Sequence, residues 1–142
     1  MVQSDRGGQI TYHGPGQLIV YFMINFKNHI IKPTDLVKVI EKICLSFLQD
    51  LGVTSHLLPK APGVYIDNKK LISIGLRIKN YCSYHGIALN INTNLEYFKY
   101  INPCGFTGMQ MINLQEISPL TTIIDCKKQL QLKILEYLDY PL

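Results

Sequence analysis

Apolar runs separated by polar turns extend along the whole chain and predict a mixture of strands and helices. Leu18 to Phe26 is rich in β-branched and aromatic residues, which is typical of a buried strand. Pro33-Thr34-Asp35 predicts the start of an amphipathic helix, with Asp35 in its first turn. Apolar residues recur three and four positions apart from Leu36 to Leu51, and Gly52 predicts the end of this helix. The same spacing predicts a final helix from about Thr122 to Tyr137.

The middle of the chain carries the pattern of a β-hairpin followed by further strands. Val64 to Asp67 and Lys70 to Ile78 flank Asn68-Lys69, which predicts a tight turn at those two residues. Ser83 to Ile91 has the composition of another strand, and a weaker strand is predicted over Met111 to Leu114. Hairpins mixed with helices predict an α/β (mixed α+β) fold, with a largely antiparallel sheet flanked by helices.

Length and composition indicate one folded domain over residues 1–142. The chain is 47% hydrophobic and 17% charged, far from the composition of disordered chains. Its longest apolar run is much shorter than the roughly 20 residues that span a bilayer, and its N-terminus lacks the apolar segment of a secretory signal. We therefore expect a cytoplasmic protein without membrane contact. The net charge of +4 is dispersed, which argues against nucleic-acid binding and leaves an acidic protein partner open.

The cysteines form no metal-binding or disulfide pattern, but one of them has a distinctive setting. No Cys-x-x-Cys pair and no suitably spaced histidine occurs, so we expect neither a metal nor a cofactor. Cys104 lies between Pro103, which rigidifies the loop, and Gly105, which leaves the backbone beside the sulfur uncrowded. This favours Cys104 as a nucleophile, while a structural role as a small buried residue stays open.

A nucleophilic thiol needs a neighbouring base or cation to become a thiolate at neutral pH. The candidates are His13, His85, Lys69 and Lys70. Strand alternation predicts Lys70 on the same face as Ile72 and Ile74, with a partly desolvated amine, and Lys69 in water at the turn. A solvated lysine that merely begins the strand is the alternative. The two histidines are expected to hydrogen-bond to backbone rather than to bind a metal.

The opening stretch RGGQITYHGPGQ, from Arg6 to Gln17, is unusually rich in glycine and in directed polar side chains. It is no phosphate-binding loop, because an extended apolar run follows it instead of a helix. A plain surface turn would not need an arginine, a histidine and two glutamines. The stretch therefore favours a ligand-binding segment or a hydrogen-bond network, with an ordinary turn as the alternative.

Taken together, five segments resemble one family, the octanoyltransferases of lipoate biosynthesis, also called lipoyl(octanoyl) transferases or lipoate-protein ligase B. The matching segments are RGGQITYHGPGQL from Arg6, APGVYID from Ala61, KKLISIGLRI from Lys69, YHGIALNIN from Tyr84 and INPCGFTGM from Ile101. The resemblance implies a fold similar to the catalytic domain of lipoate and biotin protein ligases. It covers nearly the whole chain as far as about residue 113.

The resemblance also implies an activity and its partners. An acyltransferase of this family moves an octanoyl group from octanoyl-acyl-carrier protein to a specific lysine of a lipoyl domain, by way of a cysteine thioester. The acceptors would be the E2 subunits of 2-oxoacid dehydrogenases and the glycine-cleavage H protein. An ATP-dependent lipoate-protein ligase is the alternative enzyme. A non-catalytic remnant that binds acyl groups or the carrier protein is the alternative outside catalysis.

Site residues follow from the resemblance position by position. The nucleophile would be Cys104, and Lys70 would lower the pKa of its thiol and act as general acid and base. Substrate contacts would fall on Arg6, Gly7, Gly8, Gln9, Ile10, Thr11, Tyr12, His13, Ser73, Ile74, Gly75, Gly86, Ile87 and Ala88. Family members usually carry a strand and a helix before the Arg-Gly-Gly motif. Two expectations therefore stay open: the true start of the chain lies upstream, or the domain is N-terminally shortened relative to the family and a strand is missing from its sheet.

Overall fold

The structure, a computed structural model, describes residues 10–101 and 108–138, which form a six-stranded sheet with helices on one face. The antiparallel strand order is β1-β5-β4-β3-β2, and the short β6 pairs with β4 in parallel. The predicted α/β class with a largely antiparallel sheet is confirmed. The strands are β1 (Gln17–Tyr21), β2 (His56–Leu58), β3 (Ala61–Ile66), β4 (Lys69–Lys79), β5 (Cys82–Asn90) and β6 (Gln110–Met111).

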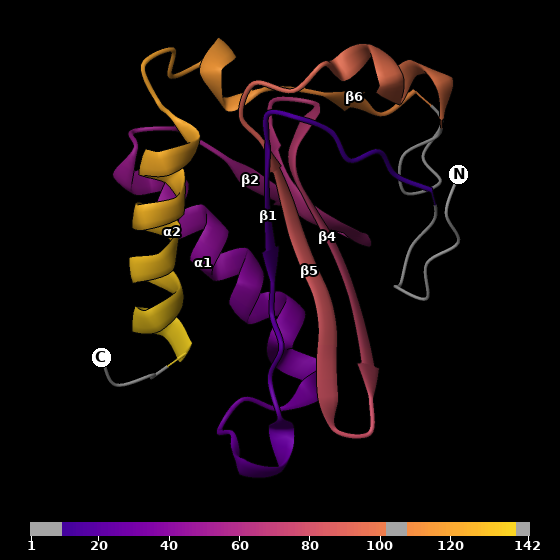
Figure 1. The fold of residues 1–142 in the computed structure, drawn as a ribbon, viewed down its shortest axis with the longest axis vertical. Helices are drawn as coiled ribbons and strands as arrows, with labels where there is room; N and C mark the ends of the chain where they lie inside the picture. The colour runs from indigo at the N-terminus through magenta and orange to yellow at the C-terminus, as the bar shows by residue number, and fades with distance from the viewer. Residues whose placement is uncertain (1–9, 102–107, 139–142) are drawn as a thin grey trace.

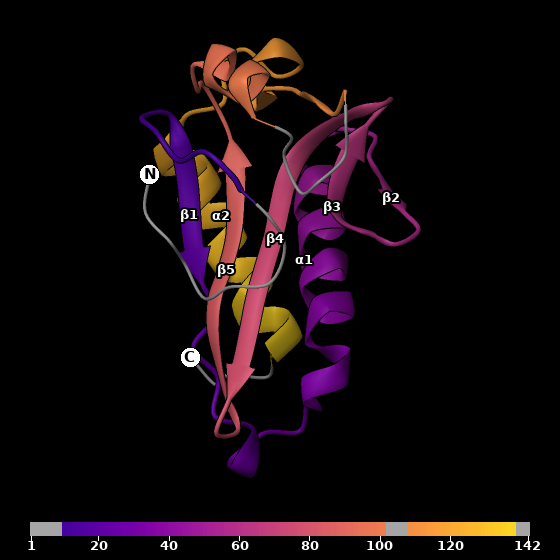
Figure 2. The ribbon, with the colours of Figure 1, turned by 90° about the vertical axis from the view of Figure 1, so that its right-hand side faces the viewer.

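Two α-helices cover the same face of the sheet, as Figure 1 shows, while Figure 2 looks onto the opposite face with the helices behind. We call this opposite face the open face, meaning the face that α1 (Leu36–Asp50) and α2 (Ile123–Leu138) do not cover. Both helices match the predicted segments, except that Pro33–Asp35, the predicted first turn of α1, forms a separate 3₁₀ helix. Short 3₁₀ helices complete the connections: η1 (Phe26–Asn28), η2 (Pro33–Asp35), η3 (Leu95–Tyr100) and η5 (Leu114–Glu116).

The hydrophobic core lies between the helices and the sheet. Ile40 and Phe47 of α1 and Leu89 of β5 are fully buried, and Cys126 of α2 joins the same cluster. The last turn of α1 ends as predicted, because Gly52 takes a left-handed φ of 71° that side chains disfavour. None of the described helices is long and apolar enough to cross a membrane.

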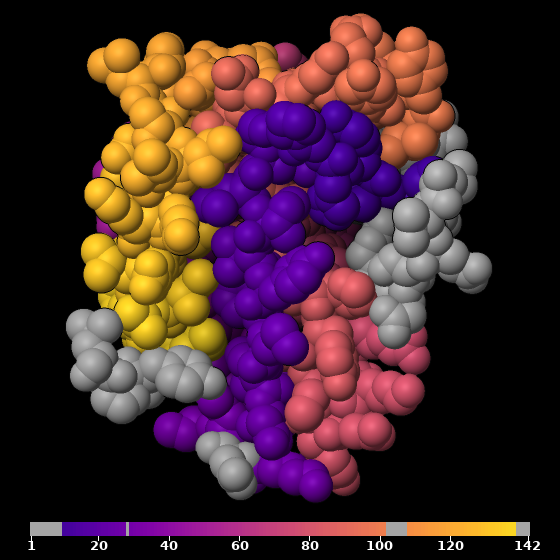
Figure 3. Space-filling model, viewed as in Figure 1, coloured from indigo at the N-terminus to yellow at the C-terminus, as the bar shows by residue number. Residues whose placement is uncertain are grey.

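Strand boundaries differ from the sequence-based predictions in several places. The strand predicted over Met111 to Leu114 is only Gln110–Met111, because η5 begins at Leu114. The hairpin turn falls on Asp67-Asn68, one residue earlier than predicted, because Lys69 already pairs with Ile66. The first strand ends at Tyr21, although an isolated bridge from Asn25 to Cys82 extends the pairing. Strand β2 was not predicted, since its three residues are too few to show alternation. In Figure 3, β1 is visible at the surface as the strand between α2 and β5.

Candidate active site

Lys70 is the charged side chain that the fold buries most completely among the described residues. It has no exposed surface, and its Nζ donates a hydrogen bond of 3.1 Å to the carbonyl oxygen of Pro62. The same Nζ lies 5.2 Å from the ring centroid of Tyr65, whose hydroxyl donates to the carbonyl oxygen of Ala61. A lysine amine enclosed in this way, with a carbonyl as acceptor and an aromatic ring beside it, is poorly solvated. The burial of Lys70 agrees with the expected desolvation, and its part in proton transfer stays a prediction.

The face on which Lys70 lies corrects the alternation predicted from the sequence. Val64 pairs with Ile72, but the next residue of β3, Tyr65, pairs with Lys70, so Leu71 is an extra residue in β4. This β-bulge lets both Leu71 and Ile72 enter the core. Lys70 is consequently turned to the open face, opposite Ile72 and Ile74, and the predicted shared face was wrong.

Small residues on three neighbouring strands line the open face beside Lys70. We call them the small-residue floor: Gly63, Ser73, Gly75, Gly86 and Ala88. Ser73 of β4 stands opposite Gly63 of β3 on one side and Ala88 of β5 on the other. Two residues further along, Gly75 pairs with Gly86. Antiparallel partners share a face, so these five positions lie together. The structure thus brings Lys70 together with Ser73, Gly75, Gly86 and Ala88, four of the predicted substrate contacts.

Two other predicted contacts, Ile74 and Ile87, pair with each other but belong to the opposite face. Ile87 is in the hydrophobic core, and Ile74 packs against it. Only their backbone atoms could therefore meet a substrate on the open face. Their proposed roles remain predictions.

The described part of the opening stretch forms a hydrogen-bond network at the start of β1. Tyr12 packs against the rings of Tyr97 and Phe98, with centroids 4.8 and 5.4 Å away. His13 Nδ1 lies 3.1 Å from the Oε1 of Gln17, a side-chain contact where we expected backbone contacts. Ile10 is exposed and Thr11 half-buried. The predicted contacts Arg6, Gly7, Gly8 and Gln9 lie outside the described residues.

Asn90 extends this network to the open face and was missed as a site residue. Its Oδ1 accepts a hydrogen bond of 2.8 Å from the Nε2 of Gln17, and its side chain is buried. Asn90 follows Ala88 and Gly86 at intervals of two residues along β5, so strand alternation would have placed it beside them. Tyr65 was missed as well, because the bulge that brings it opposite Lys70 leaves no signal in the residue pattern.

The predicted nucleophile Cys104 lies outside the described residues, and the three described cysteines are poor alternatives. Burial raises the pKa of the Cys44 thiol to about 12, and Glu41 adds to the effect. Burial likewise raises the pKa of Cys126 to about 11. Cys82 pairs with Lys79, nine residues beyond Lys70 along β4 and so roughly 30 Å away. None of these three thiols therefore meets both requirements, a thiolate at neutral pH and proximity to Lys70.

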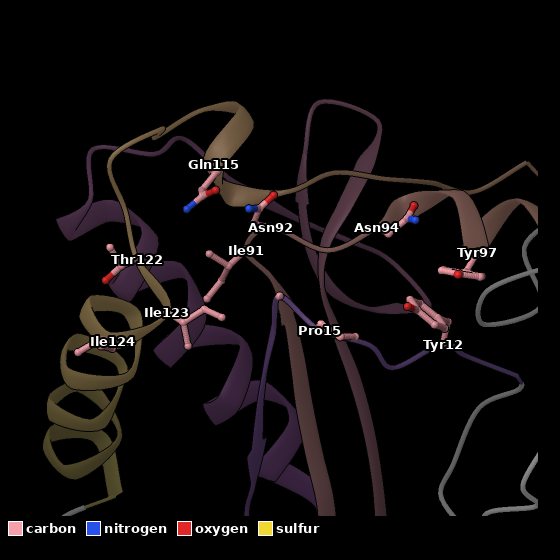
Figure 4. A pocket seen from close by; sticks show the side chains of 11 residues that line it. Tyr12, Pro15, Ile91, Asn92, Asn94, Tyr97, Gln115, Thr122, Ile123 and Ile124 are labelled. Atoms are coloured by element: carbon pink, nitrogen blue, oxygen red, sulfur yellow. The ribbon is translucent and has the colours of Figure 1, made fainter.

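A pocket of about 730 Å³ opens elsewhere, between the start of β1, η3 and the start of α2, as Figure 4 shows. It is lined mainly by apolar and aromatic side chains, among them Tyr12, Pro15, Ile91, Tyr97, Ile123 and Ile124. Among the residues that the structure describes, its lining includes no lysine, histidine, cysteine or carboxylate. Over residues 10–101 and 108–138, no three His, Cys, Asp or Glu side chains could hold a metal ion. The described lining of the pocket thus offers no amine, imidazole, thiol or carboxylate, whereas the open face has Lys70.

Solved structures define the class of fold. A crystal structure of lipoate-protein ligase A bound with ATP matches with a TM-score of 0.73 at 15% identity, covering 95% of this chain and 57% of that one. Biotin protein ligase from Aquifex aeolicus, in complex with biotin and ATP, matches with a TM-score of 0.68 at 20% identity, covering 87% and 50%. The domain therefore has the fold of a lipoate or biotin ligase catalytic domain, as the sequence resemblance implied.

Sequence comparison then shows the family. The model of the lipoyl protein ligase A/B catalytic domain matches residues 1–135, and the chain belongs to this family. A protein of Vibrio campbellii (strain ATCC BAA-1116) named octanoyltransferase is 47% identical over 140 residues, 99% of this chain and 64% of the relative. One of Yersinia pseudotuberculosis serotype O:1b (strain IP 31758), with the same name, is 46% identical over 141 residues, 99% and 60%. The chain thus spans less than two thirds of the length of these relatives.

Proposed function

We propose that this chain is an acyltransferase that moves an octanoyl group from octanoyl-acyl-carrier protein to a lysine of a lipoyl domain. The observation that carries the proposal is the fully buried Lys70, which the β4 bulge turns to a floor of small residues on the open face. The similarity of the chain to proteins named octanoyltransferase, over 99% of the chain's length, supports the same reaction. A buried amine suits proton transfer, and small residues leave room for an apolar chain.

In the proposed reaction, the Cys104 thiol gives its proton to Lys70 and attacks the carbonyl carbon of the octanoyl thioester. The tetrahedral adduct collapses, the bond to the carrier's sulfur breaks, and the carrier thiol leaves with a proton. The amine of the incoming lysine then attacks the new thioester, and the Cys104 thiol leaves as the amide forms. Lys70 accepts and returns the proton in each half-reaction. Because an amide is more stable than a thioester, no ATP is needed.

The proposed acceptors are the lipoyl domains of 2-oxoacid dehydrogenase E2 subunits and of the glycine-cleavage H protein, and the proposed location is the cytoplasm. The dispersed net charge of +4 is compatible with acidic protein partners. The acyl-carrier protein and the lipoyl domain must reach the same acyl group one after the other. A two-step exchange through one enzyme thioester allows this.

The decisive test is mass spectrometry of the chain after incubation with octanoyl-acyl-carrier protein. We expect one octanoyl adduct, which fragment ions of the tryptic peptide 100–127 place on Cys104, and its disappearance when a lipoyl domain is added and becomes octanoylated. Cys126, on the same tryptic peptide, and Cys44, on the peptide 43–60, serve as internal controls, because burial raises the pKa of both thiols. Octanoylation from free octanoate only when ATP is supplied would favour a ligase. Carrier binding without any adduct would favour a non-catalytic protein.

Replacing Gly63 with alanine is expected to displace Lys70. A Cβ at this position would lie 2.5 Å from the backbone oxygen of Ile72, so the pairing of β3 with β4 beside Lys70 would have to shift. It would also lie 3.0 Å from the Cε and 3.4 Å from the Nζ of Lys70, and the φ of 138° disfavours any side chain. We expect acylation of Cys104 to slow by up to about 10²-fold, because small displacements of a reacting group have effects of that size. Single-turnover acylation by octanoyl-acyl-carrier protein measures the change.

The matched control is Gly52→Ala, because Gly52 also has a left-handed φ of 71° but would place its Cβ in open space. This variant should lose only about 1 kcal/mol of stability and acylate at the wild-type rate. Equal acylation rates in the two variants would contradict the role of Gly63 in seating Lys70.

A further inference from the structure

Asn90 is a buried amide with one hydrogen-bonding group left unpaired. Its side chain is only 1% exposed, and within the described ranges its Nδ2 has no hydrogen-bond partner. An amide nitrogen carries two N–H donors, and nearly all such groups are paired when they are buried. An unpaired donor lowers stability, so its retention in the interior calls for a reason.

The direction of the unpaired donor follows from the hydrogen bonds of Gln17. The Oε1 of Gln17 faces the N–H of Gly14, and its Nε2 donates to the carbonyl oxygen of Tyr12 at 3.2 Å. A backbone N–H can only donate a hydrogen bond and a backbone carbonyl oxygen can only accept one. These two contacts therefore fix which end of the Gln17 side-chain amide is the donor. The same Nε2 donates to Asn90, so the oxygen of Asn90 must face β1. Its Nδ2 is at the other end of the planar amide, directed away from β1.

The neighbour of β5 on that side is β4, the strand that carries Lys70. Asn90 lies on the open face, two residues beyond Ala88 and one beyond the Ile72–Leu89 pair. Because of the bulge, the next residue of β4 on the open face at this end is Lys70. The unpaired donor and the buried lysine therefore occupy the same end of the small-residue floor. Both side chains are shielded from water, which strengthens hydrogen bonds to a developing charge.

We infer that the Nδ2 of Asn90 donates a hydrogen bond to the carbonyl oxygen of the acyl thioester and to the oxyanion formed from it. This inference rests on the proposed function and adds a residue to it. When the thiolate adds to the carbonyl carbon, the C=O π electrons move onto oxygen, and the N–H group stabilises that negative charge. When the adduct collapses, the C=O bond re-forms as the bond to the leaving sulfur breaks. The donor itself neither gains nor loses a proton.

The test compares single-turnover acylation of the wild-type chain with that of Asn90→Asp and Asn90→Ala. The aspartate keeps an oxygen to accept from Gln17 but has no donor in place of Nδ2. We expect acylation to slow by about 10²- to 10³-fold in both variants, as for other amide donors to an oxyanion, with unchanged affinity for the carrier protein. Thr93→Val is the matched control, since Thr93 Oγ1 is also buried and has no hydrogen-bond partner in the described part of the chain. It should acylate at the wild-type rate.

A second measurement uses the wild-type chain alone and does not depend on how the variants fold. In nitrogen-15 spectra, the side-chain amide signals of Asn90 should shift when the enzyme is acylated, because a new acceptor reaches the donor. Unchanged signals, or variants that acylate as fast as the wild type, would overturn the role of Asn90 and leave the proposed function intact. A wild-type chain that forms no adduct would overturn both.

Discussion

Replacing Lys70 with methionine is expected to slow acylation of Cys104 by about 10³-fold, within the range that a general acid or base contributes. Methionine has a similar length and fills the same space between Pro62 and Tyr65, but it cannot accept or return a proton. The variant should fold normally and be at least as stable as the wild type, because it no longer buries a polar amine. Single-turnover acylation and thermal unfolding measure the two effects.

Lys69→Met is the matched control for this prediction. Lys69 is adjacent, only half-buried, and pairs with Ile66 at the start of β4. Its replacement should leave the acylation rate unchanged. A further readout separates proton transfer from packing: the rate of Cys104 alkylation should reach its plateau at a higher pH in Lys70→Met than in the wild type. A Lys70→Met variant that acylates as fast as Lys69→Met would refute a chemical role for this amine.

Replacing Gly86 with alanine is expected to destabilise the fold by about 3 kcal/mol or more, as severe overpacking does. The added Cβ would collide with the backbone carbonyl oxygen of Val20, and a ring carbon of Phe22 lies only 3.1 Å from its position. A backbone atom cannot change rotamer, so β1 would have to move away from β5. Chemical denaturation followed by circular dichroism measures the loss, which should lower the melting temperature by about 6–12 °C.

Gly108→Ala provides the control for Gly86. A Cβ there would meet nothing within 4 Å, although the φ of 78° disfavours a side chain. We expect a loss of about 1 kcal/mol, from backbone strain alone. Similar losses of unfolding free energy in the two variants would show that β1 can move away from β5 at little cost in stability. The clash also indicates that Gly86 is needed for strand packing, whatever contact it makes with a substrate.

Part of the candidate site follows directly from local sequence patterns. The two-residue period of β5 places Gly86, Ala88 and Asn90 on one face, and the three- and four-residue spacing of α1 identifies the side that enters the core. The five sequence segments also indicated the family, which the comparison confirms. These features were predictable because each depends on residues close together in the chain.

The position of Lys70 could not be predicted in the same way. Alternation counted along β4 places it with Ile72 and Ile74, in the core. The bulge at Leu71 reverses this, and it exists because β3 pairs with β4 in a shifted register after Val64. The amide direction of Asn90 likewise depends on Gln17, which is 73 residues distant in the sequence.

The sequence by itself therefore determined the helices, most of the strands, the family and the residues from which a site could be built. Periodicity and turn chemistry act over a few neighbouring residues, so one sequence is enough to read them. Only the tertiary structure decided which face Lys70 occupies, which thiols are buried, and where the donor of Asn90 points. Each of those outcomes depends on atoms supplied by distant strands, because burial and hydrogen-bond partners arise only when the strands pair.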